Sequence, residues 1–330
     1  MAFPGCGNST GPAVQLDSVF YSNKVQGWLR QTVPSVVGVS TIFIYDVETF
    51  NHQLVNGVFV SDPTSPSGYL LAGGDSARVI LSDQRERVNG VGLIIYRDEF
   101  KAAVLTNAHL ITREDTALTY FRNSEGELTN VLYSRATRRS TSNYVIGQVE
   151  QFIQAEVLSA DEKTDLGLLL VTSSPALGIE YSFGVSPPQS LKWADFAYVF
   201  GNPRETKQLT SGIISPLSQR GFFIIDAVAR SGFSGGPVLV VRPDKGLELA
   251  GIISGVPSEK LFYVAPPVNY IPGQKLSPSD RDQFYAEEAD LIQYGTAYAI
   301  GTQLIFEFLD QAAGELYRKG ISLSSKYSFK

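Results

Sequence analysis

The sequence predicts a mostly β protein, built as a sandwich or a barrel. Its apolar segments are short and rich in Val, Ile, Tyr and Phe, as in VGLIIY, LGLLLV and PVLVV. Turn-forming residues separate these segments, because the 330 residues include 30 glycines and 17 prolines spread along the chain. Short apolar runs bounded by Gly, Pro, Asn and Asp are typical of buried strands. With 43% hydrophobic residues, the chain is able to bury a sizeable core.

The N-terminal part of the chain is expected to pass from a flexible segment into the folded domain. Residues 1–17 carry no periodic pattern and are expected to be flexible, and the domain then covers 18–330. Apolar positions at helical spacing predict a short helix over 18–34, followed by a strand over 35–45. Residues 46–87 are polar and rich in turn formers, so we expect a long surface insertion there.

The rest of the chain alternates predicted strands with connections. Strands are expected over 88–171 and again over 191–256, joined by a polar connection. Residues 257–293 form a second polar insertion, in which SPSDRDQFYAEEADLIQ predicts a short helix because of its Ser-Pro start and its early acidic residues. Helical spacing over 301–318 predicts a C-terminal helix that ends before Gly320.

Composition excludes several classes of function. The net charge is −6 and the basic residues form no long cluster, which argues against a nucleic-acid partner. No apolar stretch is long enough to span a bilayer. One cysteine and two histidines, without metal-ligand spacing, predict that there is no metal site, and we expect no cofactor.

The single cysteine, Cys6, cannot form an internal disulfide. It lies in MAFPGCGNST, where a small residue precedes the cysteine and a polar tail follows it. This stretch resembles the start of a processed bacterial lipoprotein, although the apolar segment that would precede it is missing. The alternatives are therefore a lipid anchor at Cys6 and an ordinary thiol in a flexible N-terminus.

One serine lies in a stretch that is suited to nucleophilic chemistry. In ARSGFSGGPVL, Ser234 follows Gly232 by two positions and is followed at once by Gly235. The stretch is either a flexible turn between strands or a backbone bent around a nucleophile. In the second case the glycines allow the N–H groups of Gly232 and Ser234 to point at one spot, which forms an oxyanion hole.

A serine nucleophile needs a base, and the base needs a group that holds it. His109, directly after the apolar segment AAVLT, is the better placed of the two histidines, because His52 is expected to be an exposed loop residue in the first insertion. Asp165, at the polar edge of LGLLLV, is the candidate carboxylate. The order His, Asp, Ser is that of chymotrypsin.

Several segments follow one another in a recognisable order. They are VPSVVGVST (33–41), GVGLII (90–95) followed by VLTNAHLI (104–111), AEVLSADEKTDLGLLLV (155–171), SLKWADFAYVFGNPRE (190–205), LTSGIIS (209–215), IDAVARSGFSGGPVL (225–239) and YGTAYAIGTQLIFEFLDQ (294–311). With these segments the chain resembles trypsin-like serine proteases of the HtrA/Deg type. The resemblance implies two six-stranded antiparallel β-barrels, at about 35–172 and 190–300, with a C-terminal helix at about 301–318.

The resemblance also implies roles for individual residues. Ser234 would be the nucleophile, His109 the base and Asp165 the group that orients it. Ser254 would support the aspartate, although it also reads as a turn residue. The first specificity pocket would be lined by Val228, Ser254, Gly255 and Val256, which predicts an apolar pocket for small or medium aliphatic side chains.

Two departures from the family pattern change what is implied. Phe233 precedes the serine, where the HtrA/Deg group usually has Asn and the digestive proteases have Asp. Activation by a freshly cut N-terminus is therefore excluded, and distortion of the oxyanion hole is a concern. Too few residues follow Leu309 for a PDZ domain, and no signal peptide is recognisable.

The resulting expectation is a serine endopeptidase that acts on proteins or peptides outside the cytoplasm, in the periplasm or cell envelope, in quality control or regulation. The alternative is a protease-like binding module with impaired catalysis. An α/β-hydrolase esterase is disfavoured because the candidate residues follow the order His, Asp, Ser, whereas that fold has the order Ser, Asp, His. A homotrimer through Phe20, Tyr21 and Trp28 is a further possibility, although core packing explains these aromatic residues equally well.

Overall fold

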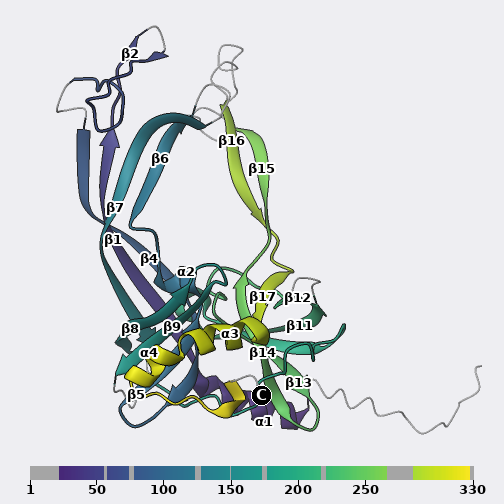
Figure 1. The fold of residues 1–330 in the computed structure, drawn as a ribbon. Coiled ribbons are helices and arrows are strands. Elements are labelled where there is room, and N and C mark those ends of the chain that lie inside the picture. The colour runs from purple at the N-terminus through teal and green to yellow at the C-terminus, as the bar shows by residue number, and fades with distance from the viewer. Residues whose placement is uncertain are drawn as a thin grey trace, which may run out of the picture.

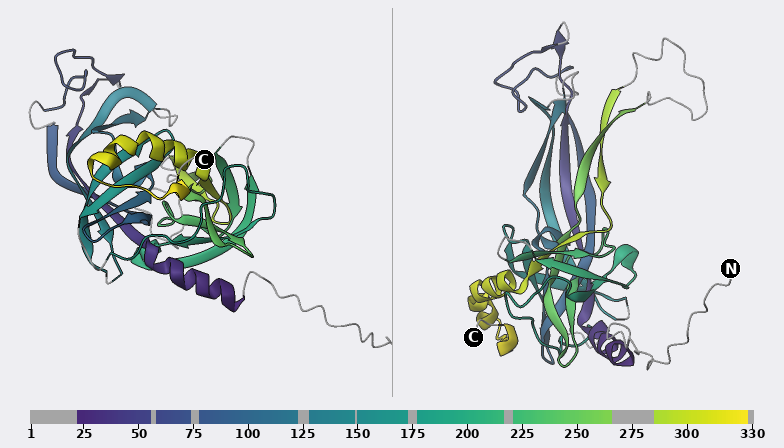
Figure 2. Two further views of the ribbon diagram at one scale, coloured as in Figure 1. Left: turned by 60° about the horizontal axis from the view of Figure 1, so that its bottom comes forward. Right: turned by 90° about the vertical axis from the view of Figure 1, so that its right-hand side faces the viewer.

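The computed structural model describes residues 22–55, 58–73, 78–122, 128–148, 150–172, 177–216, 221–265 and 285–327. Two β-barrels lie next to each other, and two groups of strands rise from them in the same direction (Figures 1 and 2). The segment expected to be flexible (1–17), Cys6, Phe20 and Tyr21 lie outside the described residues.

The first barrel has six antiparallel strands and closes through pairing of its first and last members. Around the barrel these are β1 (Val36–Phe50), β4 (Arg78–Arg97), β5 (Lys101–Thr106), β9 (Leu166–Thr172), β8 (Phe152–Asp161) and β7 (Leu128–Ile146). The β1–β7 register runs from Gly38 opposite Ile146 to Thr49 opposite Ser134. A further strand, β6 (Thr116–Arg122), pairs with β7 outside the barrel.

The second barrel is also a closed ring of six antiparallel strands. Its order is β10 (Phe196–Gly201), β11 (Gln208–Pro216), β12 (Phe222–Asp226), β17 (Ala297–Gly301), β14 (Gly246–Gly255) and β13 (Pro237–Arg242). The prediction of a mostly β protein with two six-stranded antiparallel barrels is therefore confirmed. Strand interiors that read as continuous apolar runs are buried, as in β9 and β13.

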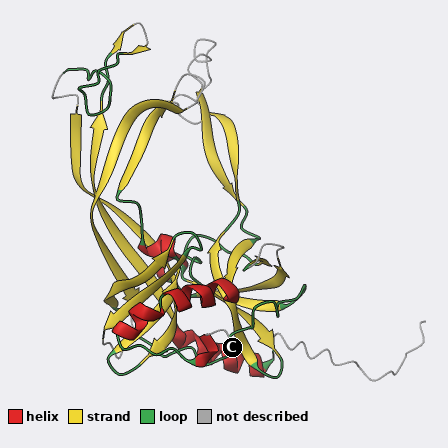
Figure 3. Cartoon of the chain, viewed as in Figure 1, coloured by secondary structure: helices red, strands yellow, loops and turns green. Residues whose placement is uncertain are grey.

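The helices are short and lie around the barrels (Figure 3). They are α1 (Asn23–Thr32), α2 (Ala108–Ile111), α3 (Thr302–Gln311) and α4 (Ala313–Arg318), with 3₁₀ turns η2 (Val33–Ser35), η4 (Pro203–Glu205) and η6 (Ser325–Tyr327). The helix expected over 301–318 is divided at Ala312, whose ψ of −5° ends α3. Ile305, Phe308 and Leu309 of α3 belong to a core cluster that includes residues of both barrels.

Helix α1 begins one turn later than the predicted helix and is capped by Ser22, whose hydroxyl accepts a hydrogen bond from Val25 N. Trp28 packs against the main core cluster of its own chain, and Lys24 Nζ lies 5.0 Å from the centre of its ring. Trp28, which was considered for trimer formation together with Phe20 and Tyr21, therefore packs within its own chain.

About half of the described residues of the first polar insertion are in strands. β1 and β4 stay paired beyond the barrel as far as Phe50 opposite Arg78. Together with β6 and residues 128–138 of β7 they form an extension that we call the first arm, which comprises 43–50, 78–86, 116–122 and 128–138 (Figure 1). The small hairpin β2 (Leu54–Val55) and β3 (Val58–Phe59) lies at its end.

The second insertion forms a two-stranded antiparallel second arm, β15 (Ser258–Ala265) with β16 (Tyr285–Ile292) (Figure 2). The prediction of a short helix over 277–293 is wrong for residues 285–292, because these residues form strand β16. Residues 266–284 lie outside the described residues. Cross-strand pairing overrides the local helical signal here, including an ion pair between Lys260 and Asp290 with 3.0 Å between nitrogen and oxygen.

His52 is not an exposed loop residue, so that expectation is wrong. Its side chain is 6% exposed, at the end of the first arm, and its ring lies 5.3–6.3 Å from those of Phe50, Phe59, Tyr69 and Phe121. Nε2 is 2.9 Å from the Ser67 hydroxyl. Burial among these rings lowers the pKa of His52 below its usual value, because the charged ring would lose its hydration.

The end of the first arm is expected to loosen in acid. The lowered pKa of His52 means that the folded arm favours the neutral ring. The neutral ring therefore contributes fully to the stability of the arm above pH 6.5, the ordinary histidine pKa, and this contribution is lost as the pH falls below that value. Hydrogen exchange over 51–71, corrected for intrinsic rates, should therefore speed up between pH 7.5 and pH 5. His52→Phe should remove this acceleration. Equal protection of the wild-type arm at both pH values would contradict the prediction.

Candidate active site

His109 and Asp165 meet at the end of the first barrel. His109 lies in α2, one turn of helix directly after β5, and Asp165 immediately precedes β9. The ring Nδ1 of His109 is 2.9 Å from each carboxylate oxygen of Asp165, and the backbone N–H of His109 donates to Oδ1 at 3.0 Å. A carboxylate only accepts, so Nδ1 carries the proton, and Nε2 of the neutral ring is an acceptor.

The backbone of Asp165 also fixes the start of α2. Its carbonyl accepts hydrogen bonds from the backbone N–H of Ala108 at 3.2 Å and from the side-chain amide of Asn107 at 2.9 Å. Asp165 adopts a left-handed φ of 57°, a conformation that aspartate tolerates better than most residues. The sequence analysis did not identify Asn107, although its position between β5 and His109 was a usable signal.

Ser254, from β14 of the second barrel, contacts this pair. Its hydroxyl donates to Oδ2 of Asp165 at 2.9 Å. Of the two interpretations offered for Ser254, the hydrogen bond supports the one in which it holds the aspartate. Its backbone carbonyl accepts from the Ser234 hydroxyl at 3.5 Å, the outer limit of a hydrogen bond. Ser254 therefore spans the distance between Asp165 and Ser234.

The loop before Ser234 is a tight turn that requires glycine. The N–H of Phe233 donates to the carbonyl of Arg230 at 3.0 Å, and Gly232 has a φ of +96°, which together define a type II turn. A Cβ on Gly232 would also lie 2.7 Å from Cα of Pro203. Gly235 has a φ of +77°, and a Cβ there would lie 2.0 Å from the carbonyl oxygen of Val91. Neither position tolerates a side chain.

Two backbone N–H groups of this loop remain unpaired. In the described part of the chain, neither Gly232 N–H nor Ser234 N–H donates to a protein acceptor, whereas the N–H groups of Phe233, Gly235 and Gly236 all do. Gly232 is buried, and a buried N–H without a partner is unusual in a folded protein. The two free donors are those predicted for an oxyanion hole, and they are available to a ligand atom.

The nucleophile loop is held directly against the first barrel. The carbonyl of Ser234 accepts from Val91 N–H at 2.8 Å, and a Cβ on the preceding residue, Gly90, would lie 2.8 Å from that same carbonyl oxygen. Gly90 therefore permits the close approach of β4 to the nucleophile loop. The sequence analysis included GVGLII among the segments that resemble the family, but it did not predict the contact of this segment with Ser234.

Phe233 does not distort the loop. Its side chain is buried in the core cluster of the second barrel. A Cβ on Gly201 would lie 2.5 Å from the Phe233 ring, so the glycine at the end of β10 makes room for it. The ring therefore anchors the turn by apolar packing, and the concern raised by this departure from the family pattern has no support in the geometry.

The predicted specificity-pocket residues do not share one environment. Val228 is 64% exposed between the buried residues Ala227 and Ala229, so it is not the floor of an enclosed pocket. Val256 is partly buried against the core of the second barrel, and the space beside Gly255 is open, with nothing within 4 Å of an added Cβ. An open, shallow apolar site is therefore the arrangement that these residues allow.

Within the described ranges, no three His, Cys, Asp or Glu side chains are grouped as a metal site would require. The same residues include no helix with the length and apolar character needed to cross a membrane.

Two barrels of this topology, with a histidine–aspartate pair from one and a serine on a glycine turn from the other, have the trypsin-like fold. Residues 90–243 match the family model of the trypsin-like peptidase domain. No curated protein sequence matches the chain.

Solved structures that resemble the chain include the HtrA-type protease AlgW with a decapeptide. It is 16% identical, with a TM-score of 0.48, and the match covers 89% of this chain and 67% of that one. A variant of AlgW with a decapeptide gives 17% identity, a TM-score of 0.48 and coverage of 90% and 67%.

Proposed function

We propose that the protein is a serine endopeptidase that cleaves peptide bonds through Ser234, His109 and Asp165. The observation that carries the proposal is the position of Ser254. Its hydroxyl binds the Asp165 carboxylate, which in turn binds His109, while its carbonyl contacts the Ser234 hydroxyl. All three candidate catalytic residues therefore lie around one residue of β14.

The chemistry follows from the roles that these contacts allow. Ser234 Oγ attacks the scissile carbonyl, and Nε2 of His109 takes its proton and then gives it to the leaving amine. Asp165 holds the ring in the tautomer that leaves Nε2 free and stabilises the ring when it becomes charged. The oxyanion is bound by the N–H groups of Gly232 and Ser234, each typically worth about 3 kcal/mol. Water then hydrolyses the acyl-enzyme, again with His109 as base.

The proposed substrates are proteins or peptides, with quality control or regulation outside the cytoplasm as the proposed setting. This setting rests on the resemblance of the sequence segments to HtrA/Deg proteases. The free donors of Gly232 and Ser234, and the buried anchor of Phe233, favour an active enzyme over a binding module with impaired catalysis.

Digestion of a peptide library should show cleavage after Val, Ala or Leu, with little cleavage after Lys, Arg, Asp or Glu. No charged side chain is among the proposed pocket residues, and burial of a charge without a partner is costly. Discrimination among aliphatic residues should be modest, because one methylene is worth about 1–3 kcal/mol. Cleavage mainly after basic residues would show that Val228 and Val256 do not line the pocket. No cleavage of any library member would contradict the proposed activity.

A further inference from the structure

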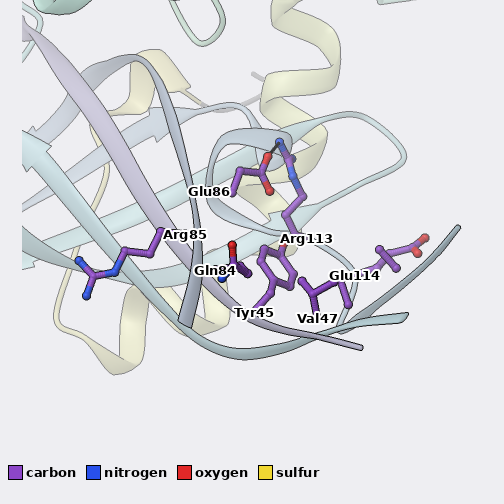
Figure 4. A pocket seen from close by; sticks show the side chains of 9 residues that line it. Tyr45, Val47, Gln84, Arg85, Glu86, Arg113 and Glu114 are labelled. Atoms are coloured by element: carbon purple, nitrogen blue, oxygen red, sulfur yellow. Dashed lines mark ion pairs between the residues drawn. The ribbon is translucent and has the colours of Figure 1, made fainter. Parts of the chain in front are cut away.

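The first arm carries a hollow of about 530 Å³ outside the proposed catalytic residues (Figure 4). A volume of this size is within the range of sites that bind small ligands, about 300–1,000 Å³. The side chains that line it come from β1, β4, β6, β7 and the segment after α2. They are Tyr45, Val47, Gln84, Arg85, Glu86, Arg113, Glu114, Ala117 and Ala136.

The hollow exists because small residues occupy one transverse row of the arm. Val47 of β1 is opposite Ala136 of β7, and Ala136 is opposite Ala117 of β6. Tyr45, two residues before Val47 and therefore on the same face, stands beside this row and is opposite Gln84 of β4. Two neighbouring alanines leave a space that larger side chains would fill.

The hollow has an apolar floor and a charged rim. Val47 and the two alanines contribute only apolar groups, and Glu86 and Arg113 lie at the rim, whereas the Arg85 side chain points away from it (Figure 4). Arg113 and Glu86 form an ion pair at 3.6 Å, and the guanidinium of Arg113 also lies 5.5 Å from the centre of the Phe43 ring. Because the Arg113 guanidinium is already paired with Glu86, and the floor is apolar, the hollow favours an apolar side chain over a charged ligand.

The hollow borders the segment that carries His109. Arg113 and Glu114 follow α2, the helix that carries His109, and the Arg113 guanidinium donates a hydrogen bond to the His109 carbonyl. The leaving amine receives its proton from His109, so the part of the substrate beyond the cleaved bond starts beside this residue. The first arm rises from the position of α2 (Figure 1).

We propose that the hollow binds an apolar side chain of the polypeptide substrate, C-terminal to the cleaved bond. This inference rests on the proposed function, and it adds a specificity site built from the first arm. A substrate that extends along the arm and carries Leu or Phe there is held at two places, at the proposed catalytic residues and at the hollow. A short peptide is held only at the first.

The test compares two fluorogenic peptides that share one cleavage sequence, one ending shortly after the cleaved bond and one continuing with a segment that contains Leu and Phe. In Ala117→Trp, where the indole fills the hollow, the ratio of kcat/KM for the long peptide to that for the short one should fall about tenfold. Thr116→Trp is the matched control, because Thr116 is exposed and lies on the opposite face of β6. This control should keep the wild-type ratio.

Two further measurements test the same proposal, one by changing the peptide and one by measuring binding without cleavage. Replacing Leu and Phe by Ser in the long peptide should lower the wild-type ratio by a similar factor, without any change in the protein. Anisotropy of the labelled long peptide with Ser234→Ala protein measures binding without cleavage, and adding Ala117→Trp should weaken it. Weakened binding without any wild-type cleavage would refute the proposed function alone. Unchanged ratios and unchanged binding would overturn the proposal about the hollow.

Discussion

Ser234→Ala is expected to lower kcat by about 10⁴–10⁶-fold while the fold stays intact. The substitution removes the attacking oxygen, whereas the turn around it depends on Gly232 and Gly235 and on the buried Phe233 ring. The measurement is the hydrolysis of a cleaved library peptide under saturating conditions. Labelling by a fluorophosphonate should disappear in the same variant, because the probe forms a bond with an activated serine oxygen.

Ser231→Ala is the matched control for this substitution. Ser231 is exposed in the same turn and makes no contact on which the proposed mechanism depends. It should keep both the labelling and most of the activity. Labelling that persists in Ser234→Ala would show that another residue is the nucleophile, and loss of labelling in both variants would indicate damage to the loop.

Asp165→Asn should have the next largest effect, a fall in kcat of about 10⁴-fold. An amide group beside Nδ1 of His109 can present N–H donors, which favours the tautomer with the proton on Nε2 and removes the base. The amide oxygen can still accept from the backbone N–H of His109, and the Ser254 hydroxyl, which now donates to the other oxygen, can instead accept from the amide N–H, so the local structure should be preserved.

Glu162→Gln provides the comparison, because Glu162 is an exposed carboxylate in the same segment. It should leave kcat within a few-fold of the wild-type value. A loss in Asp165→Asn no greater than that in Glu162→Gln would contradict the role of Asp165. Circular dichroism and thermal unfolding of both variants would show whether any loss reflects unfolding.

The two barrels and the glycine turn before Ser234 were predictable because their signals are local. Strands such as β9 and β13 are continuous apolar runs, and the turn at Gly232 depends on residues within a few positions of Ser234. The assignment of Ser254 was left open from the sequence, because a hydroxyl that binds Asp165 is indistinguishable from one in a turn until the barrels are placed together.

The strands of the arms could not be predicted, because they pair with segments far away in the sequence and many of their residues are exposed to solvent. Residues 78–87 of β4 are all exposed, so the alternation of apolar and polar residues that usually reveals a strand is missing. The same is true of residues 258–263 in β15. These segments become strands because a partner strand satisfies their backbone groups.

The burial of His52 and the exposure of Val228 could not be predicted, for a related reason. His52 is covered by aromatic side chains from four separate positions between Phe50 and Phe121, and no local pattern brings these together. Val228 lies between two buried alanines in a loop, where the direction of each side chain depends on the course of the backbone.

Because Ser254 contacts both Asp165 and Ser234, the proposed catalysis depends on the correct docking of the two barrels. His109 and Asp165 belong to one barrel, and Ser234, the proposed nucleophile, and Ser254 belong to the other. A separation of the barrels that left each of them folded would break the bonds from Ser254 to Asp165 and from Val91 to Ser234 together. Activity would then be lost at lower denaturant concentrations than secondary structure, and a ligand that bound both barrels would protect activity first.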